Sequence, residues 1–170
     1  DCQSIFGLAR EVAAALGQPL KTPALDYTET EVEKEGFEVT VDAQDLCPRY
    51  IAHYVYDVKL GQSPAWMRRR LALVGNNSIS NIVDITNYIM RELGQPLHAF
   101  DCNFLEGNAI QVRRANEGEK IVTLDEKEFT LNPNNLVICD GKKPVALAGI
   151  MGGLNSEIRD TTTEVMFESA

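Results

Sequence analysis

The stretch SNIVDITNYIMREL, residues 80–93, sets the fold class together with the residues that follow it. Its apolar positions recur at the spacing of one helix face: Ile82, Val83, Ile85, Ile89 and Leu93. We therefore expect a helix that begins near Ser80 and that Gly94 closes. Beyond Phe104 the helical spacing is replaced by short runs typical of strands.

Two further helices are predicted upstream. Ser4 can cap a helix over residues 5–16 that Gly17 stops, and its apolar face must pack on something else. Ser63 as an N-cap, followed by Pro64 at the first helical position, predicts a helix that Gly75 closes. Between these helices, residues 18–36 are acidic and lack periodicity, which indicates a loop or linker.

The remaining pattern predicts strands. Residues 37–41 alternate between apolar and polar, and residues 50–60 predict a long, well-buried strand. Six short strands are expected at 110–113, 121–124, 128–131, 136–139, 145–150 and 165–168. Two central helices followed by strands indicate an α+β fold. We expect the helices to pack on a layered, mixed, sandwich-like sheet arrangement, preceded by a small helical segment.

Composition excludes several classes of protein. The 170 residues are 44% hydrophobic, enough for a core, and no apolar run approaches the roughly 20 residues of a membrane span. The net charge is −9, but 10 acidic and 3 basic residues lie within 1–48, and Arg68-Arg69-Arg70 forms one basic cluster later. Charge therefore leaves RNA contact open without supporting it.

The ends and the cysteines give further expectations. The chain starts at Asp1 without a signal peptide, as a piece cut from a longer protein would. Four cysteines stand far apart with no C-x-x-C pair, which disfavours a zinc site and fits a reduced, cytoplasmic protein.

Three segments carry polar residues that the helix and strand patterns do not require: 84–88, 94–101, and 148–153 with the strand that ends at Glu168. Each has a simple structural interpretation. Asn87 can be a solvated amide, and His98 a structural histidine in a Pro-containing turn. The glycines around residue 150 can form a tight turn or a strand end that another group approaches closely.

Two other features, one acidic and one basic, have equally plain structural interpretations. Glu168 can lie on an edge strand facing water, and residues 68–70 can be the polar side of a helix. No serine nucleophile elbow, H-E-x-x-H zinc site or phosphate-binding glycine motif is present. The pattern alone predicts an α+β domain with a candidate polar pocket.

Specific stretches resemble a known family. Residues 1–13, Cys47-Pro48-Arg49-Tyr50 and Trp66-Met67 are similar to the bacterial phenylalanyl-tRNA synthetase β subunit, in order. So are residues 83–88, 92–101, Gly149-Ile150-Met151-Gly152-Gly153 and Phe167-Glu168. The resemblance covers essentially the whole chain, and the run from Asp84 to Asp101 is long and specific.

The resemblance implies a subunit of a cytoplasmic α₂β₂ ligase that joins phenylalanine to its tRNA with ATP and magnesium. The synthetic site of that ligase lies in the α subunit, so no cofactor is expected in this chain and no membrane is involved. The matching region is the editing domain, which hydrolyses tyrosine mistakenly esterified to the phenylalanine tRNA. Residues 1–46 would be part of the N-terminal module and its linker, and residues 47–170 an editing-type domain truncated at its C-terminal end.

The resemblance also implies roles for individual residues. Glu168 corresponds to the acceptor for the tyrosine phenol, and Gly149 and Gly152 correspond to residues that line the slot for the ring. His98 and Asn87 correspond to residues near the ester, where His98 would position water, hold the ribose or share developing charge. No covalent nucleophile is implied.

Two departures support an alternative. Asn77 stands where the family carries an arginine at the pocket mouth, and the family's pocket uses residues beyond Glu168, close to the last residue Ala170. These departures, with the acidic balance, leave open a non-catalytic module that docks tRNA or a subunit and has lost editing.

Overall fold

The structure is a computed structural model that describes residues 2–24, 26–28 and 36–170. It divides into two compact units, each built from two segments of the chain. The helical unit comprises Asp1–Glu33 and Gln62–Leu97, and the strand-rich unit comprises Lys34–Gly61 and His98–Ala170. This division follows contacts in space and does not test the predicted domain boundary between residues 46 and 47, which stays a prediction.

The helical unit begins with α1, Ile5–Leu16, which has the predicted caps. The Ser4 hydroxyl accepts the Gly7 N–H at 2.9 Å, and Gly17 takes the left-handed conformation with φ 62°. The apolar face of α1 is exposed at Ile5, Leu8, Val12 and Leu16. Most of this face is therefore left uncovered within the described residues, although α1 contacts α3 (Asn81–Leu93) and Ile5 borders a cavity of the helical unit.

The other two helices are α2, Ala65–Leu73, and α3, Asn81–Leu93. Ser80 caps α3 and Gly94 ends it with φ 83°, as the sequence predicts. The prediction that Ser63 caps α2 is wrong, because α2 has no side-chain cap and the Ser63 hydroxyl donates to buried Asp84 at 2.5 Å. Asp84 also accepts the Ser78 hydroxyl at 2.5 Å and the Ile79 N–H at 2.8 Å, so it ties the segments around α2 and α3 together.

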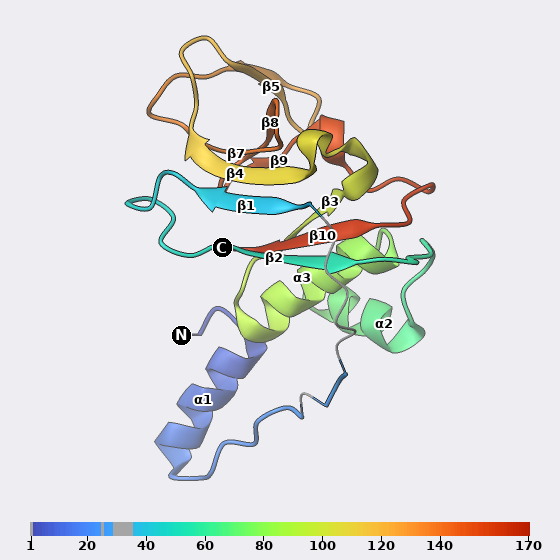
Figure 1. Ribbon diagram of the computed structural model, residues 1–170. Coiled ribbons are helices and arrows are strands. Elements are labelled where there is room, and N and C mark those ends of the chain that lie inside the picture. Colours follow the sequence, from blue (N-terminus) through green and yellow to red (C-terminus); the bar gives the residue numbers. More distant parts are fainter. Residues whose placement is uncertain (1, 25, 29–35) are drawn as a thin grey trace. The chain divides into compact units, whose positions relative to one another are not determined.

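The strand-rich unit contains a five-stranded sheet in the order β1-β4-β7-β8-β9 (Figure 1). Its strands are β1 Glu38–Val41, β4 Ala109–Arg114, β7 Leu136–Cys139, β8 Pro144–Leu147 and β9 Met151–Gly152. β1 and β4 are parallel, and the other neighbours are antiparallel, so the sheet is mixed.

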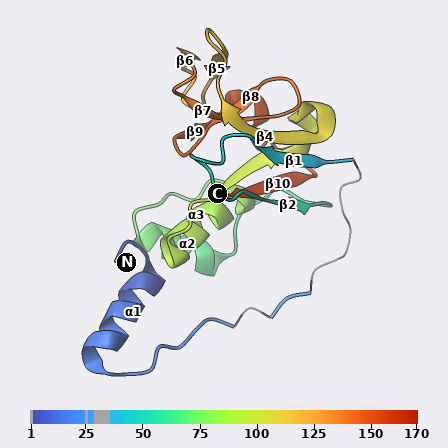
Figure 2. The ribbon, with the colours of Figure 1, turned by 60° about the vertical axis from the view of Figure 1, so that its left-hand side comes forward.

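The second sheet has three antiparallel strands in the order β2-β10-β3. They are β2 Ile51–Val55, β3 His98–Asp101 and β10 Val165–Ser169. A hairpin of β5, Lys120–Val122, and β6, Glu128–Thr130, completes the strands and stands out at one end in Figure 2. Three short 3₁₀ turns, Cys102–Phe104, Glu106–Asn108 and Leu154–Ser156, connect them.

The main core lies between the two sheets. Phe100 and Met166 of the three-stranded sheet pack in one cluster with Ile110, Ile138 and Val145 of the five-stranded sheet. A second cluster fills the other side of the five-stranded sheet, beneath the β5–β6 hairpin: Ala115, Ile121, Leu131, Val137 and Cys139. Cys47 and Cys102 also belong to the main core. The layered, sandwich-like arrangement and the α+β class are confirmed.

Three strand predictions need correction. The strand expected over 145–150 ends at Leu147, because residues 147–150 form a turn closed by the Ile150 N–H and the Leu147 carbonyl. The long buried strand expected over residues 50–60 ends at Val55, because Asp57 adopts a positive φ of 54° that a strand cannot continue through. β2 is also only partly buried, with Ile51 exposed. β3 was not predicted, since His98 was assigned to a turn, and the structure makes it the first residue of a strand. No helix among the described residues is long and apolar enough to cross a membrane.

Candidate functional site

The candidate site is built on the pairing of β3 with β10. In this antiparallel ladder Glu168 lies opposite His98, and Met166 lies opposite Phe100. Directly opposed residues share one face of a sheet, and so do residues two apart in a strand. Met166 and Phe100 are buried in the main core, so Glu168 and His98 point to the same core-covered side.

Glu168 is held in the middle of its sheet. β10 lies between β2 and β3, so the interpretation of Glu168 as an edge residue facing water is wrong. The Tyr50 hydroxyl donates to Oε2 of Glu168 at 3.1 Å. Burial raises the pKa of Glu168 to about 7, although the hydrogen bond from Tyr50 acts in the opposite direction. A carboxyl group that can be neutral or charged at physiological pH therefore lies inside an apolar wall.

His98 has the opposite response to the same surroundings. Burial lowers the pKa of its imidazole to about 4, so the ring is neutral at pH 7. Its edge packs against the Phe100 ring at a centroid distance of 4.6 Å and an interplanar angle of 72°. Nε2 is buried and has no hydrogen-bond partner within the described residues. A buried nitrogen left without a hydrogen bond costs roughly 1–3 kcal/mol. Few buried polar groups are left in this state, so His98 is a candidate functional residue.

Gly152 makes room for the His98 ring. It pairs with Ala146 in the β8–β9 ladder. A Cβ atom at this position would lie within 2.5 Å of Nε2 and against Cε1 of His98. Any larger residue would have to displace the imidazole, so the absent side chain determines where His98 sits.

Gly149 has a conformational reason instead. The Ile150 N–H donates to the Leu147 carbonyl at 3.0 Å, which closes a four-residue turn between β8 and β9. Gly149 occupies the third position with φ 69°, as a type II turn requires. A Cβ atom there would meet nothing within 4 Å. The structure thus places Gly149 at an exposed turn, and its role in lining a slot stays a prediction.

Asn87 belongs to the helical unit, where it lies half-buried on α3. Its side-chain amide makes no hydrogen bond within the part of the chain that the structure describes. Asn77, which the resemblance sets against a family arginine, is exposed in the loop between α2 and α3. The other four predicted residues lie in the strand-rich unit, and His98, Gly152 and Glu168 are brought together there.

Two residues of this cluster were not predicted from the sequence. Tyr50 contacts Glu168 from the start of β2, and its place in the Cys-Pro-Arg-Tyr stretch was the available signal. Leu124 donates its N–H to the Gly152 carbonyl at 3.0 Å, and its Cδ1 lies 3.2 Å from the Cβ position of Gly152. Leu124 is thus a second neighbour of the space beside Gly152, and no sequence pattern marked it.

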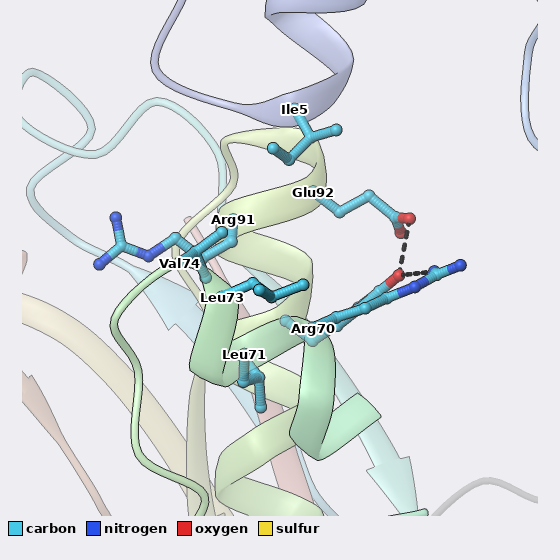
Figure 3. Close-up of a pocket in the computed structure, with 8 residues that line it drawn as sticks. Ile5, Arg70, Leu71, Leu73, Val74, Arg91 and Glu92 are labelled. Atoms are coloured by element: carbon cyan, nitrogen blue, oxygen red, sulfur yellow. Dashed lines mark hydrogen bonds between the residues drawn. The ribbon is translucent and has the colours of Figure 1, made fainter. Parts of the chain in front are cut away.

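A cavity of about 410 Å³ lies in the helical unit (Figure 3). It is lined by Ile5, Arg70, Leu71, Leu73, Val74, Tyr88, Arg91 and Glu92. The Tyr88 hydroxyl bridges its polar rim, since it accepts from Arg70 at 2.5 Å and donates to Glu92 at 3.0 Å. None of the predicted site residues lines this cavity, and Arg91, which does, donates to Asn76 outside the lining at 2.8 Å.

Comparisons with known proteins agree with the resemblance. A family model described as the B3/4 domain matches residues 46–170. Over its whole length, the chain is 57% identical to a phenylalanine–tRNA ligase β subunit from Syntrophus aciditrophicus, and 53% identical to one from Bdellovibrio bacteriovorus. The chain spans 21% of the length of each of these relatives.

A solved structure shows the same fold. It is an N-terminal fragment of the phenylalanyl-tRNA synthetase β subunit from Pyrococcus horikoshii, with a TM-score of 0.58 and 15% identity. The match covers 98% of this chain and 50% of that fragment. The family model covers most of the chain, and the relatives that match its whole length carry the name that the sequence resemblance predicted. The chain therefore belongs to the B3/4 domain family and is similar throughout to phenylalanine–tRNA ligase β subunits.

Proposed function

We propose that the protein containing this chain is the β subunit of a phenylalanine–tRNA ligase and that this region hydrolyses tyrosine mistakenly attached to the phenylalanine tRNA. The whole ligase would act with an α subunit as an α₂β₂ assembly in the cytoplasm and would need ATP and magnesium. The 21% span of the relatives limits this chain to one part of that activity. The pairing of Glu168 with His98 on a buried sheet face is the observation that carries the proposal.

A second site is needed because tyrosine differs from phenylalanine by one hydroxyl. An apolar pocket rejects an added hydroxyl by only about 10². A pocket with a buried acceptor selects in the opposite direction, since phenylalanine leaves the acceptor unpaired at a cost of roughly 1–3 kcal/mol. Glu168 is suited to this role, because it is a carboxyl group in an apolar wall and its pKa is raised to about 7 by burial.

The phenol itself would favour binding to the charged form of Glu168. A hydroxyl that donates to a carboxylate stabilises the ion and lowers its pKa. Tyrosine would therefore provide a hydrogen bond to the carboxylate in addition to that from Tyr50, and phenylalanine would not. This difference supports tyrosine as the selected side chain.

His98 would serve the ester end of the substrate. Its ring is neutral at pH 7, because burial lowers its pKa to about 4, and a neutral imidazole can accept a hydrogen bond from water or donate one to an oxygen. Nε2 is buried and has no hydrogen-bond partner within the described residues, so its capacity for such a bond is unused. An aminoacyl ester is already activated, so a held water and stabilised developing charge are sufficient for hydrolysis.

Gly152 and Asn87 complete the proposed roles. Gly152 leaves room for the His98 ring and for Leu124, which already fill the position of its missing Cβ. We assign Gly152 to the slot for the tyrosine ring on the family resemblance. We assign Asn87 to the ester end with His98, on the family resemblance. Gly149 is assigned to the slot on the same ground, with its turn conformation as the structural requirement.

Hydrolysis of preformed mischarged tRNA tests the proposal. The full-length protein is compared with its Glu168→Ala variant on tyrosyl- and phenylalanyl-tRNA specific for phenylalanine. We expect the preference for the tyrosyl ester to fall at least roughly tenfold, as the loss of one hydrogen bond to a charged group predicts. Glu117→Ala, at an exposed turn of the same unit, is the matched control.

The competing hypothesis, a docking module without editing, predicts a different result. The unmodified protein would then hydrolyse neither ester faster than the uncatalysed reaction in buffer, while it would still bind the tRNA. Unchanged tyrosine preference in Glu168→Ala, with hydrolysis intact, would show that Glu168 does not recognise the phenol.

A further inference from the structure

We infer that Tyr50 is a positioning residue of the proposed phenol site: its hydroxyl holds Oε2 of Glu168 and leaves Oε1 to accept the phenol of the tyrosyl group. This inference rests on the proposed function, since it assigns different partners to the two oxygens of the carboxyl group that the proposal uses. Tyr50 itself would not touch the substrate.

The register of β2 explains how Tyr50 reaches Glu168. Ala52 lies directly opposite Glu168 in the β2–β10 ladder, and His98 lies opposite it on the other side. Alanine is small, so it leaves the flank of the glutamate open. Tyr50 lies two residues before Ala52, which brings a long aromatic side chain to the diagonal position on the same face. The Tyr50 ring packs against the main core as it crosses this gap.

The direction of the hydrogen bond is fixed by burial. Desolvation is the main cause that raises the pKa of Tyr50 far above its ordinary value, and the charge of Glu168 acts in the same direction. The phenol of Tyr50 therefore keeps its proton at every physiological pH and donates it to Glu168. A carboxylate offers two oxygens, so one donor does not exhaust its capacity.

The second oxygen remains open to a ligand. Oε1 of Glu168 makes no hydrogen bond within the described residues. The buried side-chain polar atoms that lack a partner in that part of the chain are His98 Nε2 and Asn155 Oδ1, and Oε1 is not among them. Oε1 is therefore not sealed in the interior. A carboxylate already held through Oε2 loses less rotamer freedom when a phenol binds to Oε1.

The titratable neighbours of Glu168 are few. Tyr50 approaches from β2 and His98 from β3, while the five-stranded sheet contributes apolar side chains to the core beneath them. The Tyr50 hydrogen bond is the contact that favours the charged form of Glu168. Removal of that hydroxyl should therefore move the titration of Glu168 to higher pH.

The test uses Tyr50→Phe in the full-length protein, which keeps the ring and removes the hydroxyl. Deacylation of tyrosyl- and phenylalanyl-tRNA specific for phenylalanine is measured as kcat/KM from about pH 5 to about pH 9, which extends roughly two pH units on either side of neutrality. We expect the preference for the tyrosyl ester to fall roughly tenfold at pH 7. We also expect the pH at which the tyrosyl reaction is half-maximal to shift upward, which a loss of packing alone would not cause.

Tyr54→Phe is the matched control. Tyr54 lies on β2, which begins directly after Tyr50, and it also bonds a glutamate, Glu164 instead of Glu168. It should leave both the preference and the pH profile unchanged. A double variant, Tyr50→Phe with Glu168→Ala, should behave like Glu168→Ala alone, because Tyr50 acts only through that carboxyl group.

The outcomes separate the inference from the proposed function. If Glu168→Ala abolishes the tyrosine preference and Tyr50→Phe changes neither preference nor pH profile, the role of Tyr50 is wrong and the proposed function stands. If Tyr50→Phe hydrolyses the tyrosyl ester faster, Tyr50 competes with the substrate for Glu168, and the positioning role is overturned. If Glu168→Ala has no effect, the phenol site itself is wrong.

Discussion

His98 and Glu168 are direct partners across the antiparallel pair of β3 and β10, and burial drives their protonation in opposite directions. It lowers the pKa of His98 to about 4 and raises the pKa of Glu168 to about 7. Between these values both side chains are mainly neutral, so the pair is not a salt bridge. It consists of two polar groups in an apolar wall, each with hydrogen-bonding capacity that the fold leaves unused.

Under the proposed function, this pairing would place two different chemical tasks on neighbouring strands. Glu168 can accept a phenol, and His98 can bind water or an ester oxygen while it stays neutral. Gly152 leaves the room that the imidazole itself occupies, and the Tyr50 hydroxyl holds the carboxyl group from the side of β2. The predictions below test these relationships one at a time.

Gly152→Ala should disable the site through His98. The new Cβ would collide with the imidazole, so we expect the ring to be displaced and tyrosyl-tRNA deacylation to fall at least roughly tenfold. Overpacking should also lower the free energy of unfolding by roughly 1–3 kcal/mol. Deacylation by the full-length protein and urea unfolding of the 170-residue chain measure the two effects.

Gly141→Ala is the control for overpacking. A Cβ at Gly141 would meet the Glu106 carbonyl oxygen at 2.9 Å, in a loop that does not involve His98. It should destabilise the chain to a similar extent and leave the deacylation rate of the folded protein unchanged. Equal loss of activity in both variants would mean that packing, and not the position of His98, explains the effect of Gly152.

Glu168→Gln should remove one component of the pH dependence of stability. The pKa of Glu168 is raised from 4.5 to about 7 in the folded state, so its favourable contribution is present below pH 4.5 and is lost as the pH rises to 7. The glutamine variant cannot ionise. We therefore expect it to gain stability relative to the parent chain across this window, by on the order of 3 kcal/mol at most.

Urea unfolding of both chains from pH 4.5 to pH 8 measures this difference. Glu117→Gln removes one exposed carboxyl group and serves as the reference variant. A stability difference for Glu168→Gln that stayed constant with pH would contradict the buried, neutral state of this side chain.

The helices could be predicted because their signals are local. Ser4 with Gly17, and Ser80 with Gly94, each lie within one helix length of each other, and both pairs cap as expected. Ser63 failed because a distant group competed for its hydroxyl: Asp84 lies 21 residues later and is fully buried. A cap motif cannot reveal such a partner.

The strands of the site depend on partners far away in the sequence. β3 becomes a strand because β10 provides its ladder, and His98 and Glu168 are separated by most of the C-terminal half of the chain. The Tyr50–Glu168 hydrogen bond joins residues 118 positions apart and exists only in the observed β2–β10 register. Resemblance could therefore indicate candidate site residues, while the contacts of Tyr50 and Leu124 required the fold.

Asp84→Ala should be among the most destabilising single changes in the helical unit. Asp84 is fully buried and accepts hydrogen bonds from Ser63, Ser78 and the Ile79 N–H. Alanine would leave these donors without their partner, and we expect a loss of roughly 3 kcal/mol in the free energy of unfolding. Urea unfolding of the 170-residue chain measures it, with the exposed Asp160→Ala as control. A loss below about 1 kcal/mol would show that Asp84 does not hold these segments together.

His98 should titrate far below an ordinary histidine, and the chain offers a direct way to observe this. It contains two histidines, His53 and His98, so a His53→Gln variant assigns the imidazole C2 proton of His98 by NMR. We expect its chemical shift to change with a midpoint at about pH 4, because burial disfavours the charged ring. A midpoint near 6.5 would contradict a buried, neutral imidazole.

The same shift has a consequence for stability with the opposite sign to that of Glu168. The folded state binds fewer protons at His98 than the unfolded chain between about pH 4 and pH 6.5, so stability should fall as the pH is lowered through this window. His98→Gln should remove this loss, and the variant should therefore gain stability relative to the parent chain toward pH 4. In the double variant His98→Gln with Glu168→Gln, both pH-dependent contributions should disappear together, which urea unfolding across pH 4 to pH 8 would show.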